Sequence, residues 1–238
     1  MAKAISRSKV DLFLQCPRCF WLDARAKVRR PSGPPFSLNI AVDHLLKNEF
    51  DTYRGGDVVP PRLAREGLAF IPCDHPELPI WRQNFKGVRI EHAPTGLTLF
   101  GAIDDLWIDD NGVHYVVDYK ATAKMDEVSL DADWQIAYKR QVEFYQWLLR
   151  CRGLEVSDWA FFVYANGIKD ESPFEDVLRF RTKVIGYEGN DGWVEPTIGA
   201  IAECLSLDQA PGAHPDCPYC LYVDRAADHL PDDADGPE

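Results

Sequence analysis

Apolar residues near the start of the chain recur three and four positions apart, which is the spacing of amphipathic helices. Serine N-caps, a proline suited to a first helical turn and the stop signal Gly55-Gly56 mark the ends of these segments. The predicted helices cover about residues 8–14, 17–27 and 39–54. Residues 57–86 are interrupted by prolines and predict loops and short elements.

From Val88 onward the pattern changes to β-branched and aromatic residues separated by turn signals. The segments VRIEH, LTLFGAIDDLWI and VHYVVDYKAT are predicted to form three successive antiparallel strands. A helix over about 132–151, the strands DWAFFVYA and EDVLRFRTKVIGY, and a helix over about 194–207 capped by Asp191 follow. This order predicts one α/β domain with a mixed central sheet flanked by helices.

Composition and charge narrow the class of protein. With 238 residues, 46% of them hydrophobic, the chain can bury one sizeable core. No apolar run approaches the roughly 18 residues of a membrane span and the start lacks a signal peptide, so we expect a cytoplasmic protein without a membrane partner. The formal net charge is −12, yet residues 1–30 carry eight basic and two acidic side chains, a pattern typical either of phosphate binding or of a solvated helix face.

Two aspartates and a lysine in the predicted strands are candidates for hydrolytic chemistry. Asp118 and Lys120 are two positions apart, so they project from one face of their strand. A three-residue loop ending in a left-handed Gly112 would place Asp104 opposite Asp118 and turn Asp105 away. A divalent cation on such carboxylates neutralises a scissile phosphate and activates water, which predicts phosphodiester hydrolysis. The alternative is a solvated hairpin with an incidental ion pair.

Three motifs occur in order: GAID at 101–104, VVDYK ending at Lys120, and QVEFY at 141–145. Together they resemble the RecB-like branch of the PD-(D/E)XK nuclease superfamily. The resemblance implies a single restriction-endonuclease-like domain, which we expect over residues 1–223. The acidic tail at 224–238 is expected to be disordered.

The resemblance also implies the composition of a catalytic metal site. A Mg²⁺ or Mn²⁺ ion would bind Asp104, Asp118 and the backbone carbonyl of Tyr119, and Lys120 would be catalytic.

Further roles follow from the same resemblance. Gln141 and Tyr145, one turn apart on a helix, would support the active site and contact DNA. His44 is the candidate for a further metal ligand from an earlier helix. Because isoleucine stands four positions before it, where relatives often have glycine, Asp43 or Glu49 is the alternative source of a ligand.

Four of the seven cysteines form two CxxC pairs, Cys16 with Cys19 and Cys217 with Cys220. Four thiolates predict either a structural zinc site or an iron–sulfur cluster, and their spacing does not choose between them. The segment SKVDLFLQCPRCFWL is similar to the start of CRISPR-adaptation exonucleases and AddB-type nuclease subunits, which implies a [4Fe–4S] cluster, with Zn²⁺ as the alternative. Those relatives usually supply one cysteine from the front and three from the back. The other three cysteines are expected to be buried, with Cys204 as a reserve ligand.

The expected function is therefore that of a Mg²⁺- or Mn²⁺-dependent deoxyribonuclease, acting as an exonuclease on single-stranded DNA or DNA ends. The alternative is a non-catalytic nucleic-acid-binding or assembly module with a structural metal site. The sequence contains no helicase motif. A helicase, repair or CRISPR-adaptation protein as partner is expected by analogy alone.

Overall fold

The computed structural model describes residues 3–34, 36–170 and 173–229. The chain divides into two compact units, Met1–Arg7 with Pro34–Val194 and Ser8–Gly33 with Glu195–Glu238. Each is described by itself below. The predicted domain boundary at residue 223 stays a prediction. Among the described residues, no helix is both long and apolar enough to cross a bilayer.

The first unit alternates helices and strands, which confirms the predicted α/β class. Its strands are β1 (Ala4–Ser6), β2 (Ile71–Pro72), β3 (Val88–His92), β4 (Leu97–Gly101), β5 (Asp105–Ile108), β6 (His114–Thr122), β7 (Trp159–Gly167) and β8 (Phe180–Glu188). Its α-helices are α3 (Ser37–Asp51), α4 (Pro61–Arg65), α5 (Leu78–Trp81) and α6 (Ile136–Cys151), and short 3-10 helices cover Asp133–Gln135 and Asp191–Trp193.

The strands of this unit form two sheets. The smaller has the order β1-β4-β3 and the larger has the order β2-β5-β6-β7-β8. In the larger sheet β6 and β7 are parallel and the other neighbours are antiparallel, so the predicted mixed sheet is confirmed.

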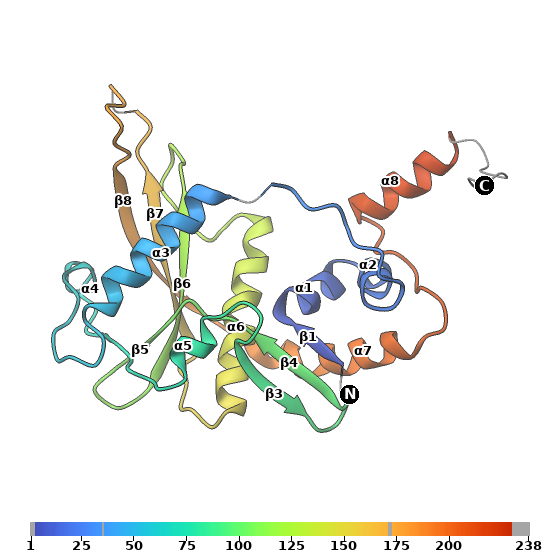
Figure 1. Cartoon of the computed structure of the whole chain (residues 1–238), viewed down its shortest axis with the longest axis horizontal. Coiled ribbons are helices and arrows are strands. Elements are labelled where there is room, and N and C mark those ends of the chain that lie inside the picture. Colours follow the sequence, from blue (N-terminus) through green and yellow to red (C-terminus); the bar gives the residue numbers. More distant parts are fainter. Residues whose placement is uncertain (1–2, 35, 171–172, 230–238) are drawn as a thin grey trace. The chain divides into compact units, whose positions relative to one another are not determined.

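Helices cover both faces of the larger sheet (Figure 1). The buried residues Val42, Leu46 and Phe50 of α3 share one core with Val117 and Tyr119 of β6. Successive residues of a strand point to opposite faces, so Asp118 and Lys120 lie on the other face, toward α6.

The predicted strand LTLFGAIDDLWI is wrong, because two strands of different sheets replace it. β4 ends at Gly101 and β5 begins at Asp105. Between them Ile103 is fully buried, and its N–H donates to the carbonyl of Trp81 instead of to a neighbouring strand. The interruption leaves Asp104 directly before β5, at the point where the two sheets separate.

The hairpin of β5 and β6 has the predicted register. Asp105 pairs with Val117, so Asp104 stands opposite Asp118, one position beyond the last pair. The connecting loop ends in Gly112, whose φ of 85° is the left-handed conformation on which the predicted register depends.

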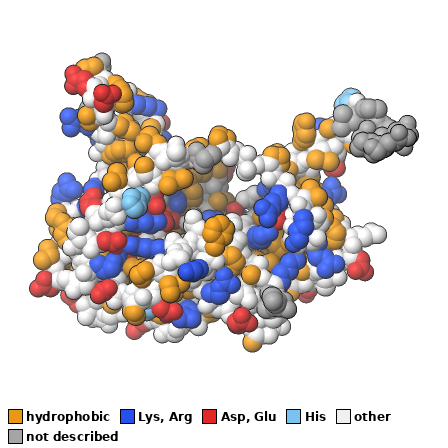
Figure 2. Space-filling view, in the orientation of Figure 1, with side chains coloured by type: hydrophobic (Ala, Val, Ile, Leu, Met, Phe, Trp, Pro, Cys, Tyr) orange, Lys and Arg blue, Asp and Glu red, His pale blue; other side chains and the backbone are white. Residues whose placement is uncertain are grey.

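The second unit is helical in its described residues. It contains α1 (Arg7–Gln15), α2 (Pro17–Trp21), a π-helical turn over Leu22–Ala26, α7 (Val194–Ser206) and α8 (Pro218–Ala227), with the first residues of α1 and α7 belonging to the first unit. The π-helical turn ends at Ala26, close to the predicted helix end at about Lys27, and Lys27 itself has the left-handed conformation. Figure 2 shows Lys and Arg side chains gathered over the region of α1 and α2, in agreement with the basic composition of this segment.

Two elements at the end of the chain differ from the predictions. Asn190, not Asp191, caps the turn before α7, because its side chain accepts the N–H of Gly192, whereas Asp191 pairs with Arg150. Helix α8 was not predicted, and it extends through the first residues of the acidic segment 224–238. Residues 230–238 of that segment lie outside the described residues.

Candidate active site and thiol cluster

Two carboxylates are held beside the start of β5. Asp118 of β6 is 0% exposed, and its Oδ1 accepts a hydrogen bond from Gln141 Nε2 at 2.7 Å. Asp104 is partly exposed, and its Oδ2 accepts the backbone N–H of Tyr119 at 3.1 Å. Burial raises the pKa of Asp118 to about 6, with Lys120 opposing this shift and the charge of Asp104 adding to it. The site thus keeps two like charges close together.

The backbone of Tyr119 faces the same carboxylates. Since the N–H and C=O of a strand residue project to the same edge, its carbonyl points to the edge where its N–H meets Asp104. Its side chain extends to the opposite face, where the hydroxyl donates to Asp105 Oδ2 at 2.6 Å. The carbonyl is therefore oriented toward the site, and its role as a ligand stays a prediction.

Two lysines supply positive charge to these carboxylates. Lys120 contacts Asp118 Oδ2 from the same face of β6. Lys47 of α3 reaches Asp104 Oδ1 at 2.9 Å and Asp43 Oδ2 at 2.8 Å. Burial lowers the pKa of both ammonium groups, but the neighbouring carboxylates outweigh it, so the pKa of each is raised. Both lysines are therefore cationic.

Two residues on one face of α6 orient the side chain of Asp118. Gln141 Nε2, which bonds Asp118, is also 3.3 Å from the hydroxyl oxygen of Tyr145. The ring of Tyr145 is buried against Gly101, where an added Cβ would lie 2.6 Å from Tyr145 Cε1. The glycine of GAID and the tyrosine of QVEFY therefore touch, and this packing places Gln141 at Asp118.

His44 does not lie with the other predicted site residues. It is exposed, and no hydrogen bond or ion pair found in the described ranges joins it to the carboxylates. The helix instead turns Asp43 and Lys47, four positions apart, toward Asp104. Glu49, the other alternative, is ion-paired with Arg62.

The side chain of Asp105 is held by ion pairs in the protein interior, in agreement with its predicted orientation away from Asp104. The side chain is fully buried, and its Oδ1 lies 2.8 Å from a guanidinium nitrogen of Arg54 and 3.0 Å from one of Arg82. Because its oxygens already meet two guanidinium groups and the hydroxyl of Tyr119, this carboxylate is not available to a metal ion.

The remaining donors suit a hard divalent cation. Carboxylate and carbonyl oxygens from Asp104, Asp118 and Tyr119 are the ligands that Mg²⁺ and Mn²⁺ prefer. In this structure, an ammonium group compensates the negative charge of each carboxylate: Lys47 pairs with Asp104 and Lys120 pairs with Asp118. The residues present therefore fit a cation site.

The profile of the PD-(D/E)XK nuclease superfamily matches residues 58–225. The chain belongs to this superfamily. The matched range contains the sequence Asp118-Tyr119-Lys120, the carboxylate pair and Gln141. The restriction-endonuclease-like fold expected from the sequence agrees with this membership.

Comparison with solved structures gives a more distant likeness. The structure titled "Crystal structure of SSO0001" matches 97% of this chain and 88% of its own chain, with 17% sequence identity and a TM-score of 0.42. No curated protein matches the sequence.

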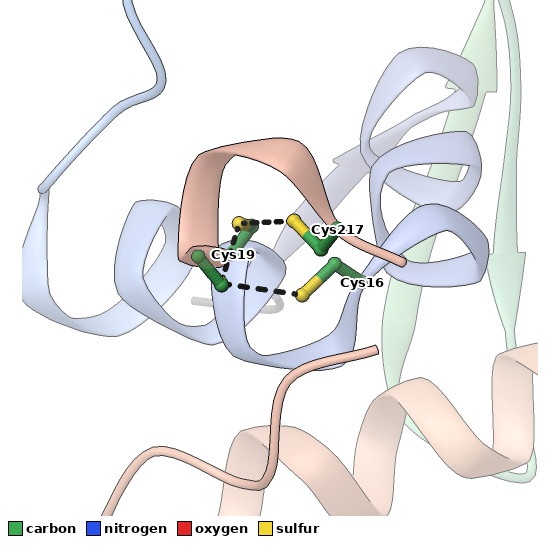
Figure 3. A group of neighbouring side chains, drawn as sticks. Cys16, Cys19 and Cys217 are labelled. Carbon is green, nitrogen blue, oxygen red and sulfur yellow. Dashed lines mark hydrogen bonds between the residues drawn. The ribbon is translucent and has the colours of Figure 1, made fainter. Parts of the chain in front are cut away.

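This PD-(D/E)XK protein also contains a buried thiol cluster in its second unit. The Sγ atoms of Cys16, Cys19, Cys217 and Cys220 all lie within 4.8 Å of one another. The shortest separations are 3.6 Å from Cys19 to Cys220 and 3.7 Å from Cys16 to Cys220 and from Cys19 to Cys217. Figure 3 shows the labelled side chains turned toward this common centre.

The two CxxC pairs are built alike. Cys16 and Cys217 are the N-cap residues of α2 and α8, each followed by proline at the first helical position, and both have extended backbones with ψ of 110° and 109°. The second cysteine of each pair lies in the first turn. Thiolates at a helix N-terminus are stabilised by its free N–H groups and dipole.

Nearby donors add to this preference for thiolates. Arg30 donates to Cys217 Sγ at 3.4 Å, and the N–H of His214 donates to Cys16 Sγ at 3.5 Å. Burial acts to raise the pKa of Cys217, but the backbone N–H of Cys220 and the neighbouring thiols lower it to about 6. At neutral pH Cys217 is thus available as a thiolate ligand, whereas burial raises the pKa of Cys19 and of Cys220, so their deprotonation would accompany metal binding.

Some functional candidates are missed or left undecided by the sequence. Lys47 is not among the predicted site residues, although its spacing to Asp43 is that of an ion pair on one helix face. Cys204 lies outside the thiol cluster, with its Sγ 4.0 Å from the carbonyl of Pro17. Cys151, which we expected to be buried, is exposed.

Proposed function

We propose that this PD-(D/E)XK protein is a RecB-like, metal-dependent deoxyribonuclease. The observation that carries the proposal is the convergence of Asp104, Asp118 and Lys120 on one cluster, with each carboxylate in contact with an ammonium group. A Mg²⁺ or Mn²⁺ ion bound by Asp104, Asp118 and the Tyr119 carbonyl would neutralise the scissile phosphate and lower the pKa of attacking water.

The chain's own groups would orient this chemistry. Lys120 is held cationic by Asp118, so its ammonium can donate hydrogen bonds to a phosphate oxygen or to water. Gln141 keeps Asp118 in one orientation through its 2.7 Å hydrogen bond, and Tyr145 keeps Gln141 in place. Gln141 and Tyr145 therefore act as positioning residues.

We propose single-stranded DNA or a DNA end as the substrate. A row of cations and rings leads away from Lys120, whose Nζ lies 4.4 Å from the ring centre of Tyr138. Tyr138 meets Trp134 edge to face with ring centres 5.3 Å apart, and Lys124 Nζ lies 5.5 Å from the ring of Trp134. Trp134 is 56% exposed. Unpaired bases stack on such rings while lysines meet the phosphates.

The test is cleavage of end-labelled single-stranded DNA by purified protein with Mn²⁺ or Mg²⁺. The variant Lys120→Ala should abolish cleavage while DNA binding in EDTA persists. Lys183→Ala, which removes a partly exposed strand lysine paired with Glu127, should cleave like the wild type. Cleavage retained by Lys120→Ala would refute the assignment. A circular single strand resists an exonuclease but not an endonuclease, so it tests the proposed mode of cleavage.

The second candidate function is a non-catalytic nucleic-acid-binding or assembly module, which the structured thiol cluster favours. DNA binding without cleavage under any divalent cation would support it over the nuclease. A helicase, repair or CRISPR-adaptation protein as partner is proposed from the family resemblance alone.

We propose that the four cysteines hold a single tetrahedral metal ion, with zinc as the candidate. A Zn–S distance of about 2.3 Å places tetrahedral sulfurs about 3.8 Å apart. Three of the six separations, at 3.6 and 3.7 Å, are close to this value, and all six lie within 4.8 Å. A [4Fe–4S] cluster, which the resemblance implies, attaches each cysteine to a separate iron and so needs more widely spaced sulfurs.

Metal analysis and an absorption spectrum of anaerobically purified protein test this site. One zinc per chain and a colourless solution would support a single ion. Iron with inorganic sulfide and a broad absorption near about 400 nm would contradict it. Cys217→Ser should lose the metal, whereas Cys204→Ser, outside the cluster, should keep it.

A further inference from the structure

Lys47 lies between two carboxylates of the first unit. Its Nζ is 2.8 Å from Asp43 Oδ2 and 2.9 Å from Asp104 Oδ1, so the two carboxylates share one ammonium group and the three groups together remain negatively charged. The Lys47 side chain is 19% exposed, which distinguishes this arrangement from a solvated surface pair. Asp43 therefore belongs to the same charged cluster as Asp104 and Asp118.

The packing of α3 fixes which residues of the helix reach this cluster. Val42, Leu46 and Phe50 are buried in the core of the larger sheet, so the rotation of the helix is set by their contacts. Asp43 and Lys47 each follow a buried residue and lie on one side of that face. His44 lies one position further around the helix, and it is exposed.

We propose that Asp43, and not His44, supplies the third side-chain ligand of the divalent-cation site, and that Lys47 holds the cation's place until metal binds. This inference rests on the proposed function. On metal binding, the Lys47 ammonium leaves the oxygens of Asp43 and Asp104, which then face the cation. The freed ammonium stays beside the site, because its helix is anchored by the core.

The charge of the cluster explains why a resident ammonium is useful. Without a cation, Asp43 and Asp104 would confront each other as two partly buried carboxylates, which is unfavourable at low effective dielectric. Lys47 reduces this repulsion and holds both carboxylates through its ion pairs. A divalent cation competes for the same oxygens, so Lys47 also sets the metal affinity.

The experiment is calorimetric titration of the full chain with Mn²⁺, which does not depend on cleavage. Asp43→Asn should weaken Mn²⁺ binding at least tenfold, and His44→Asn should leave it unchanged. Glu49→Gln is the matched charge control, because it removes a carboxylate from the same helix outside the cluster. Lys47→Met should strengthen binding severalfold, since the competing ammonium is gone.

Three results would overturn the inference: loss of affinity in His44→Asn, unchanged affinity in Asp43→Asn, or weaker or unchanged affinity in Lys47→Met. Circular dichroism of each variant verifies that it folds, and the opposite sign expected for Lys47→Met cannot arise from misfolding. Asp104→Asn and Asp118→Asn separate the two levels of the proposal. If neither weakens Mn²⁺ binding, the proposed function fails, whereas if only Asp43→Asn has no effect, this inference alone fails.

Discussion

Gly101 and Tyr145 are in such close contact that a Cβ on residue 101 would lie 2.6 Å from Tyr145 Cε1. The variant Gly101→Ala should therefore displace the buried ring and with it the hydrogen bond from Gln141 to Asp118. We expect a loss of about 1–3 kcal/mol in the free energy of unfolding, typical of overpacking, together with slower DNA cleavage. Urea unfolding and the cleavage rate measure the two effects.

A second glycine provides the control for this substitution. A Cβ on Gly199 of α7 meets nothing within 4 Å, so Gly199→Ala should leave stability unchanged or raise it through helix propensity. If Gly101→Ala is as stable and as active as Gly199→Ala, the ring contact does not position Gln141.

The register of the β5–β6 hairpin could be predicted because it depends on local sequence. Loop length and one left-handed glycine determine which residues pair, so Asp104 was expected opposite Asp118 before any tertiary contact was known. The break between β4 and β5 could not be predicted. It depends on Ile103 entering the core and bonding Trp81, which is distant in sequence.

The rotation of α3 shows the same limit. Val42, Leu45, Leu46 and Phe50 all have helical spacing, yet Leu45 is 65% exposed and the other three are buried. A shift of one position in the buried face decides whether His44 or Asp43 reaches the carboxylates. That choice is made by packing against the sheet, so the sequence left both residues as candidates.

Substitution of Asp105 should mainly reduce stability, whereas substitution of its neighbour Asp104 should mainly abolish cleavage. Asp105→Asn removes the fully buried carboxylate that Arg54, Arg82 and the hydroxyl of Tyr119 share, while both arginines keep their ion pairs with Asp51. We expect it to cost about 1–3 kcal/mol of unfolding free energy. Asp104→Asn, at a partly exposed position, should cost much less but abolish cleavage. Urea unfolding combined with Mn²⁺ titration distinguishes them. Equal stability losses would contradict the separate structural role of Asp105.

The raised pKa of Asp118 predicts that both stability and metal binding depend on pH. Burial raises its pKa from 3.8 to about 6, so the folded chain binds this proton more tightly than the unfolded chain. In EDTA, the wild type should lose stability relative to Asp118→Asn as the pH rises from about 4 through 6. Because a proton and a cation compete for this carboxylate, the Mn²⁺-induced rise in melting temperature should be large at pH 7.5 and nearly absent at pH 5.

Urea unfolding of both proteins across this pH range, with and without Mn²⁺, gives the measurement. Groups that do not interact with Asp118 titrate equally in the wild type and the variant, so their contributions cancel in the difference. A pH-independent difference would show that Asp118 has an ordinary pKa in the folded chain.

The thiol cluster should make the stability of the second unit depend on metal. Cys16 and Cys217 begin two helices that are far apart in sequence, and a bound ion would tie them together. Cys16→Ser or treatment with a strong chelator should therefore lower the melting temperature and the helical content, whereas Cys151→Ser, at an exposed position, should not. Thermal unfolding followed by circular dichroism gives the result. An unchanged melting temperature after complete metal removal would exclude a structural role for the ion.

Substitution of Trp134 should selectively weaken the binding of single-stranded DNA. Base stacking on an aromatic ring contributes about 1–3 kcal/mol, so Trp134→Ala should weaken binding of an unpaired oligonucleotide in EDTA by about fivefold to more than a hundredfold. Duplex DNA, whose bases are already stacked, should bind the variant and the wild type alike.

A fluorescence experiment tests the same contact. Quenching of tryptophan fluorescence by oligothymidylate should disappear in Trp134→Phe and persist in Trp159→Phe, which removes another indole that is 46% exposed. Quenching that survives in Trp134→Phe would place the bases on a different surface and leave the row from Lys120 to Lys124 without a role in substrate binding.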